Sequence, residues 1–232
     1  MKPTRVISLL LLLCMLLSLV SCGEKKPEIK AHLVYDAASD TLRDEERGIS
    51  YAFASVSYEP AYVGDAYADW QDTILYEVEG WSSKKLLTEE YEGVGGLIYD
   101  EKSPLPTLDE MEADKIYCCL NGKTCIQIVE DKDVIGKAVE LLTTGEAVEL
   151  PTDGIFSMSM KFASNQYAGI YYSVLYIEMG DTAYAERYLY DRGTKRCVSA
   201  GDLFLGTLYY DVENTEESRE PLKPGDDIEI KF

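Results

Sequence analysis

Downstream of residue 30 the chain consists mostly of short apolar runs that end at glycine, proline or asparagine. Within these runs large apolar residues alternate with small or polar ones, which is typical of half-buried strands whose neighbouring side chains point to opposite faces. Short turns near Asn165, Gly180 and Gly193 join the later runs into an antiparallel meander. The predicted strands are Ile49–Ser55, Thr73–Glu79, Leu97–Tyr99, Phe156–Phe162, Gly169–Met179, Ala183–Tyr190 and Arg196–Val198.

The strongest local pattern is the Asn121-Gly122 pair between two β-rich runs, Lys115–Leu120 and Lys123–Ile128. Asparagine and glycine tolerate positive φ, so this pair predicts a two-residue hairpin with a type I′ turn. In that register Cys118 lies directly opposite Cys125.

One longer segment has the period of a helix. Asp131 or Asp133 can cap its start, and Gly145 ends it. Its apolar face consists of Val134, Ile135, Ala138, Val139, Leu141 and Leu142. A shorter helix is predicted from Leu203 to Tyr210, with Asp202 as its cap.

Strands outnumber helices in this pattern, and short turns connect them. The chain is therefore predicted to be α+β, with a mainly antiparallel sheet and one or two helices. Residues 228–230 are predicted to return as an edge strand. Strand–helix–strand alternation is missing from the pattern, which counts against a periplasmic-type solute-binding protein.

The start of the chain has a different character. Lys2 and Arg5 precede the apolar run Val6–Val20. A helix of that length would span about 22 Å, which is short of the ~30 Å hydrocarbon core of a membrane. The pattern is typical of a cleaved secretory signal peptide. An uncleaved signal anchor is the alternative, and the short apolar run disfavours it.

Residues Leu19-Val20-Ser21-Cys22 resemble the lipobox of bacterial lipoproteins. The resemblance implies that Cys22 is diacylated, becomes the first residue of the mature protein and anchors it to the membrane. We expect a lipoprotein signal peptide over residues 1–21, a lipidated tether over 22–31 and one acidic domain over 32–232, or two lobes that meet near residue 130. The expected location is the extracytoplasmic face of the cell membrane.

The charge balance limits the choice of partners. The chain has 42 acidic and 22 basic residues, which gives a net charge of −20. This charge repels nucleic-acid phosphates, so we expect no nucleic-acid partner. The acidic residues are spread along the chain, which favours solubility as their role over attraction of a cationic ligand.

Four cysteines remain once Cys14 is removed with the signal peptide and Cys22 carries lipid: Cys118, Cys119, Cys125 and Cys197. The predicted hairpin register brings Cys118 and Cys125 within disulfide range and leaves the other two free or paired with each other. Four reduced, buried cysteines are the alternative, and sequence does not choose between them. A zinc site is disfavoured because neighbouring cysteines on a strand point to opposite faces.

Patterns for catalysis or metal binding are weak. The single histidine, His32, excludes a two-histidine zinc hydrolase, and no nucleophile motif surrounds it. The run 131–136 begins like a calcium loop, but Ile135 and Leu142 occupy positions that need ligand oxygens. Gly64–Asp72 combines carboxylates with aromatics and could hold calcium or stack on a sugar, although a solvated turn is favoured. We predict no catalytic residue, no metal and no cofactor.

Tyrosine is unusually frequent, with 18 residues against five phenylalanines and two tryptophans. Alternation places Tyr172 and Tyr176 on one face of a strand, and Tyr184, Tyr188 and Tyr190 on one face of the next. Such a face suits an unidentified protein or glycan ligand. Ordinary cross-strand packing is the alternative interpretation.

Residues 74–81 and 188–198 resemble segments of extracytoplasmic lipoproteins from Firmicutes that have no assigned activity. The resemblance implies an envelope location and supplies no catalytic residue. The hypothesis from sequence is therefore a non-catalytic lipoprotein that binds or senses a ligand through its tyrosine face. A carboxylate-based cell-envelope hydrolase and a scaffold or inhibitor of another envelope protein are the alternatives.

Overall fold

The computed structural model describes residues 27–81, 85–89, 96–122, 124–152, 156–180 and 185–208. Strands dominate these ranges, almost all of their pairings are antiparallel, and two helices accompany them, so the fold is α+β as predicted. Cys22, Tyr184 and the strand expected over 228–230 lie outside the described residues. No helix within the described ranges is long and apolar enough to cross a membrane.

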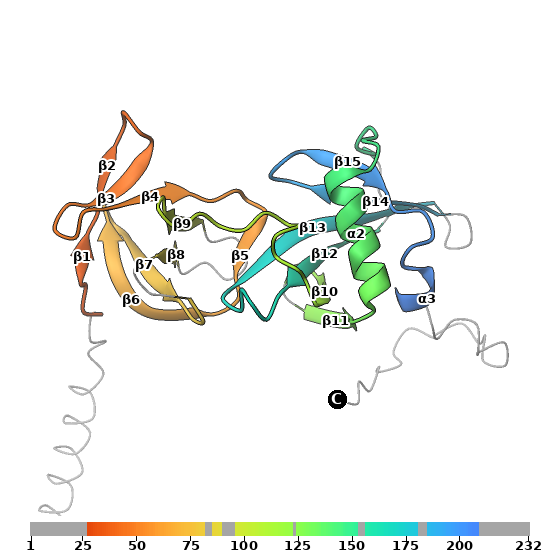
Figure 1. Cartoon of the computed structure of the whole chain (residues 1–232), viewed down its shortest axis with the longest axis horizontal. Coiled ribbons are helices and arrows are strands. Elements are labelled where there is room, and N and C mark those ends of the chain that lie inside the picture. Colours follow the sequence, from red (N-terminus) through yellow and green to blue (C-terminus); the bar gives the residue numbers. More distant parts are fainter. Residues whose placement is uncertain are drawn as a thin grey trace, which may run out of the picture.

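The first sheet has eight strands in the order β1-β6-β7-β8-β9-β4-β3-β2. Only Leu33 separates β1 from β2 in the chain, so the two ends of the sheet meet and the sheet is strongly curled (Figure 1). Its interior contains Leu42, Tyr51, Tyr67 and Leu75. The strands are β1 (Ala31–His32), β2 (Val34–Asp36), β3 (Thr41–Asp44), β4 (Ile49–Phe53), β6 (Val63–Trp70), β7 (Thr73–Val78), β8 (Leu86–Glu89) and β9 (Leu97–Asp100).

The prediction of a solvated turn over Gly64–Asp72 is wrong for most of that segment, which belongs to strand β6. The register of β6 against β7 shifts twice, between Val63 and Ala66 and between Ala66 and Ala68. These irregularities break the period of two that identifies a strand in the sequence.

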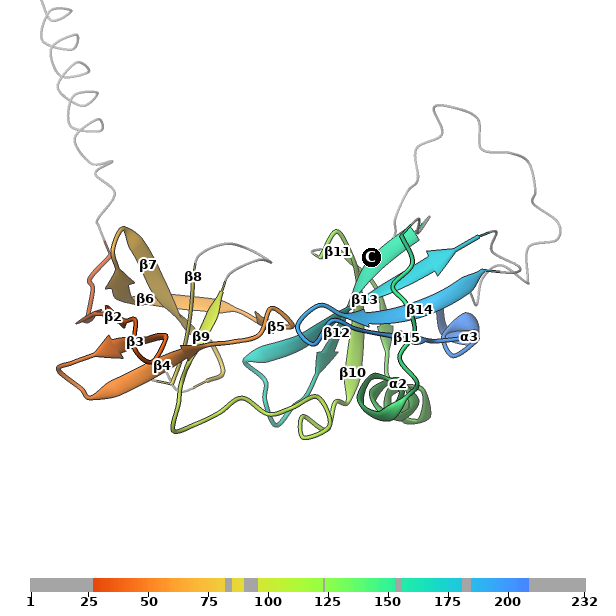
Figure 2. The same ribbon diagram turned by 90° about the horizontal axis from the view of Figure 1, so that it is seen from above.

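The second sheet has the order β11-β10-β12-β13-β14-β15, with β5 paired to β13. One of its faces packs against helix α2 and the segment 105–113, and this contact forms the main core of the protein (Figure 2). Phe204, just before helix α3, joins the same core. The strands are β5 (Tyr58–Pro60), β10 (Lys115–Leu120), β11 (Thr124–Val129), β12 (Phe156–Ala163), β13 (Ile170–Met179), β14 (Glu186–Asp191) and β15 (Arg196–Ser199).

Helix α2 (Lys132–Thr144) is confirmed as predicted. The side chain of Asp131 accepts hydrogen bonds from the backbone N–H groups of Asp133 and Val134 at 2.9 and 3.2 Å, and therefore acts as the helix cap. Gly145 ends the helix. The second helix, α3 (Leu205–Leu208), is shorter than predicted within the described residues.

The chain crosses between the two sheets three times. After β4 the chain leaves the first sheet, and β5 pairs with β13, where Tyr58 lies opposite Tyr172. The chain then returns to the first sheet and finally crosses to the second through residues 101–114. The two-lobe alternative instead puts the boundary near residue 130. Backbone hydrogen bonds support the junction, among them Ser173 N–H to Ser57 O at 2.6 Å.

The Asn-Gly hairpin forms, but its predicted register is wrong by one residue beside the turn and by two from Cys118 onward, where the β10–β11 register shifts between Cys118 and Cys119. Asn121 and Gly122 both have positive φ, as a primed turn requires. The first pair beyond the turn is Leu120 with Thr124, one residue later than a two-residue turn allows. As a result Cys119, not Cys118, lies opposite Cys125.

Candidate functional site

The second sheet has one face against α2 and one that points away from it, which we call the distal face. On β13 the core takes Tyr172, Val174 and Tyr176, so the intervening Leu175 and Ile177 point to the distal side. The strand register places partners of these residues on the same face. The distal face comprises Tyr117, Cys119, Cys125, Ile128, Lys161, Tyr171, Leu175, Ile177, Tyr188 and Tyr190.

Two of the tyrosines predicted to bind a ligand are instead part of the core. Tyr172 is 7% exposed and Tyr176 is fully buried. Tyr176 packs edge-on against Phe204, with ring centroids 5.9 Å apart. Burial also raises the pKa of the Tyr172 hydroxyl, which stays protonated and donates to a carboxylate. These two residues form no exposed binding face, because the strand side that contains them is the one that α2 covers.

Tyr188 and Tyr190 do lie on the distal face. The register places Tyr190 beside Leu175 and Tyr188 beside Ile177, and both tyrosines are half-buried. The Tyr188 hydroxyl donates a hydrogen bond of 2.6 Å to Glu186, and this bond raises the pKa of the tyrosine. This part of the distal face therefore combines apolar side chains with tyrosine hydroxyl groups.

A second pair of tyrosines extends this surface towards β10. The rings of Tyr117 and Tyr171 meet edge to face, with centroids 5.7 Å apart. Lys161 lies 5.8 Å from the centre of the Tyr171 ring. Mainly because of burial, the pKa of Tyr171 is raised to about 12, so it remains a neutral hydrogen-bonding group.

Lys161 is held by a carboxylate from the strand that joins the two sheets. Its Nζ lies 2.7 Å from Glu59 Oε2, and both side chains are largely buried. Arg192 approaches the other oxygen of Glu59 at 3.5 Å. The ion pair fixes β5 against the sheet and positions the cation under the Tyr171 ring. This pair could not be predicted from the sequence, because Glu59 and Lys161 lie far apart in the chain.

Strand β11 forms the outer edge of this sheet among the described strands. Five of its six residues are exposed, and Ile126 and Ile128 are 49% and 45% exposed. Ile128 pairs with Tyr117 and therefore belongs to the distal face. An edge strand leaves a row of backbone N–H and C=O groups free to pair with another chain. The apolar surface and the free edge are thus contiguous.

All four cysteines in the described part of the chain are free thiols. Burial raises the pKa of Cys118 to about 12 and that of Cys119 to about 11, so both remain protonated at neutral pH. The register that pairs Cys119 with Cys125 does not support the predicted Cys118–Cys125 bridge, because Cys118 points into the core under α2.

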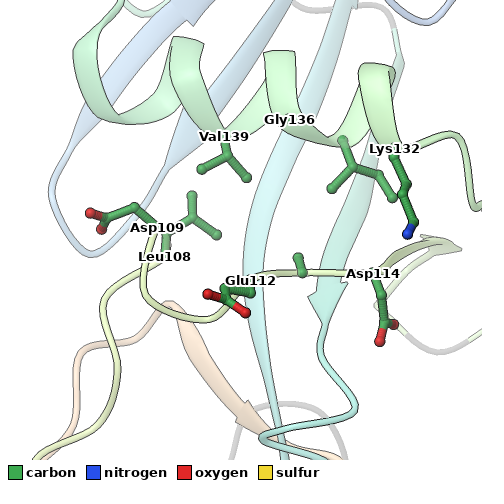
Figure 3. Close-up of a pocket in the computed structure, with 9 residues that line it drawn as sticks. Leu108, Asp109, Glu112, Asp114, Lys132, Gly136 and Val139 are labelled. Atoms are coloured by element: carbon green, nitrogen blue, oxygen red, sulfur yellow. The ribbon is translucent and has the colours of Figure 1, made fainter.

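An acidic hollow of about 330 Å³ lies between α2 and the segment 108–114 (Figure 3). Leu108, Ile135 and Val139 form its apolar floor. Its rim carries Asp109, Glu112, Asp114 and Lys132, and the three carboxylates point in different directions (Figure 3). Within the described residues no group of three or more potential ligand side chains could hold a metal ion.

Sequence reasoning also missed a buried polar cluster around Asp191. This carboxylate accepts hydrogen bonds from Ser57, from Tyr172 at 2.6 Å and from Thr194 at 2.7 Å. Burial by itself raises the pKa of Asp191, but these hydrogen bonds outweigh burial and lower it overall. The cluster is saturated with donors and fixes the junction of the sheets, so it is a structural rather than a reactive centre.

The remaining sequence candidates have ordinary environments. His32 is exposed and contacts Asp69, with 2.6 Å between Nδ1 and Oδ1. The Asp131 carboxylate is occupied as a helix cap. No family model, no curated protein and no solved structure matches this chain.

Proposed function

We propose that this protein is a membrane-anchored extracytoplasmic lipoprotein that binds an extended segment of a partner protein along strand β11 and the adjoining distal face. The single observation that carries the binding role is the exposed β11 edge with Ile126 and Ile128. An extended peptide can add a strand to such an edge, where its backbone gives affinity and its side chains meet apolar neighbours.

The chemistry of the distal face supports a protein ligand. Tyrosine rings offer rigid area and a hydroxyl group, and they are enriched at protein interfaces. Ile128 pairs with Tyr117 across β10 and β11, so a strand added at the edge would lie beside Ile128, with Tyr117 one strand further in on the same face. The net charge of −20 favours a neutral or basic partner over an acidic one.

The envelope location is supported by the lipobox at Leu19-Val20-Ser21-Cys22. Labelling with an alkynyl palmitate analogue tests it directly. Wild-type chain should carry the label and sediment with membranes, whereas Cys22→Ser should lose the label. Label that persists on this variant would overturn the assignment.

A site-specific photo-crosslinker tests the binding face. Placed at Ile126 in the full chain in cells, it should trap one protein band, whereas a crosslinker at the equally exposed Val34 on the first sheet should not. The band should disappear when Ile128→Lys is combined with the Ile126 probe. Equal trapping from both positions, or glycan adducts in place of protein, would contradict the proposal.

A further inference from the structure

We infer that Cys119 and Cys125 are an oxidation site that forms a disulfide across the β10–β11 hairpin. The two residues are direct partners in the antiparallel register. Partners of this kind have Cα atoms about 4.5 or 5.5 Å apart, and both values fall within the range of about 4.4–6.8 Å that a disulfide spans. The inference concerns a covalent modification and does not depend on the proposed binding function.

The side chains of this pair lie next to each other on the distal face. Burial is the main cause of the raised pKa of Cys119, and the neighbouring Cys125 raises that pKa further. Cys125 is exposed and Cys119 is buried beside it. One thiol is therefore open to a reagent from solution, and the other is in place to complete the bond.

The other two cysteines are poorly placed to compete. Cys118 lies opposite Gln127 and points into the core under α2, away from the distal face. Cys197 pairs with Tyr190 on β14, so strands β12, β13 and β14 separate it from Cys119. Within the described residues, Cys119 is the partner that Cys125 can reach without a change of register.

The reaction needs a disulfide-bearing oxidant, which can be a thiol–disulfide oxidoreductase or a small-molecule disulfide. The Cys125 thiolate attacks one sulfur of the oxidant and expels the first thiolate, which leaves a mixed disulfide on Cys125. Cys119 then loses its proton to solvent, and its thiolate attacks Cys125 Sγ and expels the second thiolate. The protein loses two hydrogen atoms as two electrons and two protons, and the oxidant is reduced to two thiols.

Oxidised glutathione is the probe that tests this pair. The full-length chain is incubated with it, free thiols are blocked with N-ethylmaleimide at low pH, and tryptic peptides are analysed by mass spectrometry. We expect the peptides 116–123 and 124–132 to be joined, with a mass equal to that of the two free peptides less two hydrogen atoms plus one N-ethylmaleimide on Cys118. Cys118→Ala should retain the link, whereas Cys119→Ala and Cys125→Ala should lose it.

Each other outcome argues against the pair. A link that survives in Cys119→Ala and disappears in Cys118→Ala would establish the register expected from the Asn-Gly turn. A Cys125 that stops at the glutathione adduct would show that Cys119 cannot reach it. Cys125→Ala alters an exposed side chain, so it keeps the test valid if Cys119→Ala fails to fold.

Discussion

The hydroxyl of Tyr172 donates a hydrogen bond of 2.6 Å to the buried carboxylate of Asp191. The two residues lie on neighbouring strands, and Ser57 donates to the same carboxylate from the segment that leads into β5. Gly193 N–H adds a further bond of 2.9 Å. A tyrosine near the start of β13 thus helps to offset the cost of burying a charge where the two sheets join.

We expect Asp191→Asn to destabilise the protein by about 2–3 kcal/mol, because hydrogen bonds to a buried charged group contribute about 1.5–3 kcal/mol and several donors lose their acceptor. Urea unfolding followed by circular dichroism measures the change. Asp65→Asn, which removes one charge from an exposed position on β6, is the matched control and should stay within about 0.5 kcal/mol of wild type. Equal stabilities of the two variants would refute the structural role.

The same carboxylate predicts a pH dependence. Hydrogen bonds lower the pKa of Asp191 in the folded state despite its burial, so its contribution to stability is complete above the unfolded pKa of about 3.9. The contribution is lost as the pH falls through the lower folded pKa. The stability difference between wild type and Asp191→Asn should therefore be constant from about pH 7 to 5 and shrink below about pH 4. A difference that grows on acidification would contradict this sign.

The hydrophobic pattern predicted most of the second sheet but not which face of β13 is covered. Both faces of that strand carry large apolar side chains, Tyr172 and Tyr176 on one and Leu175 and Ile177 on the other. Alternation with a period of two shows which residues share a face of the strand. It does not show which face is buried, because that depends on where α2 packs. The tyrosines predicted as a binding face were for this reason divided between the core and the distal side.

Long-range polar partners were equally beyond prediction. Ser57 and Asp191 are 134 residues apart, and Glu59 and Arg192 are 133 apart. Each looks like an ordinary turn or strand residue in its own segment. Only the pairing of β5 with β13 brings these partners together, and a strand as short as β5 has no usable periodicity.

The Glu59–Lys161 ion pair should be costly to break from one side. Glu59→Leu leaves Lys161 buried without its closest counter-charge, and we expect a loss of about 3 kcal/mol in the free energy of unfolding. Glu59→Leu combined with Lys161→Met removes both charges and should recover most of that loss. Urea titration of the single and double variants gives the coupling energy.

An exposed pair on the same sheet supplies the comparison. Lys115 and Glu130 are 2.8 Å apart, but both are substantially exposed. Glu130→Gln should therefore cost no more than about 1 kcal/mol. If Glu59→Leu costs as little as this variant, burial does not govern the strength of the Glu59 pair.

Two glycines should respond to alanine in opposite directions. A Cβ at Gly169 would lie 2.9 Å from the backbone oxygen of Glu79 and 3.2 Å from Trp81 Cβ, where the end of β7 meets the start of β13. Overpacking of this kind costs about 1–3 kcal/mol, so Gly169→Ala should lower the melting temperature. Gly136 lies inside α2 with open space around its Cβ position, and alanine there should add about 0.5–1 kcal/mol because glycine weakens a helix interior. Thermal unfolding of both variants tests the close approach of the sheets, since a tolerated Gly169→Ala would mean that the β7 and β13 ends lie further apart.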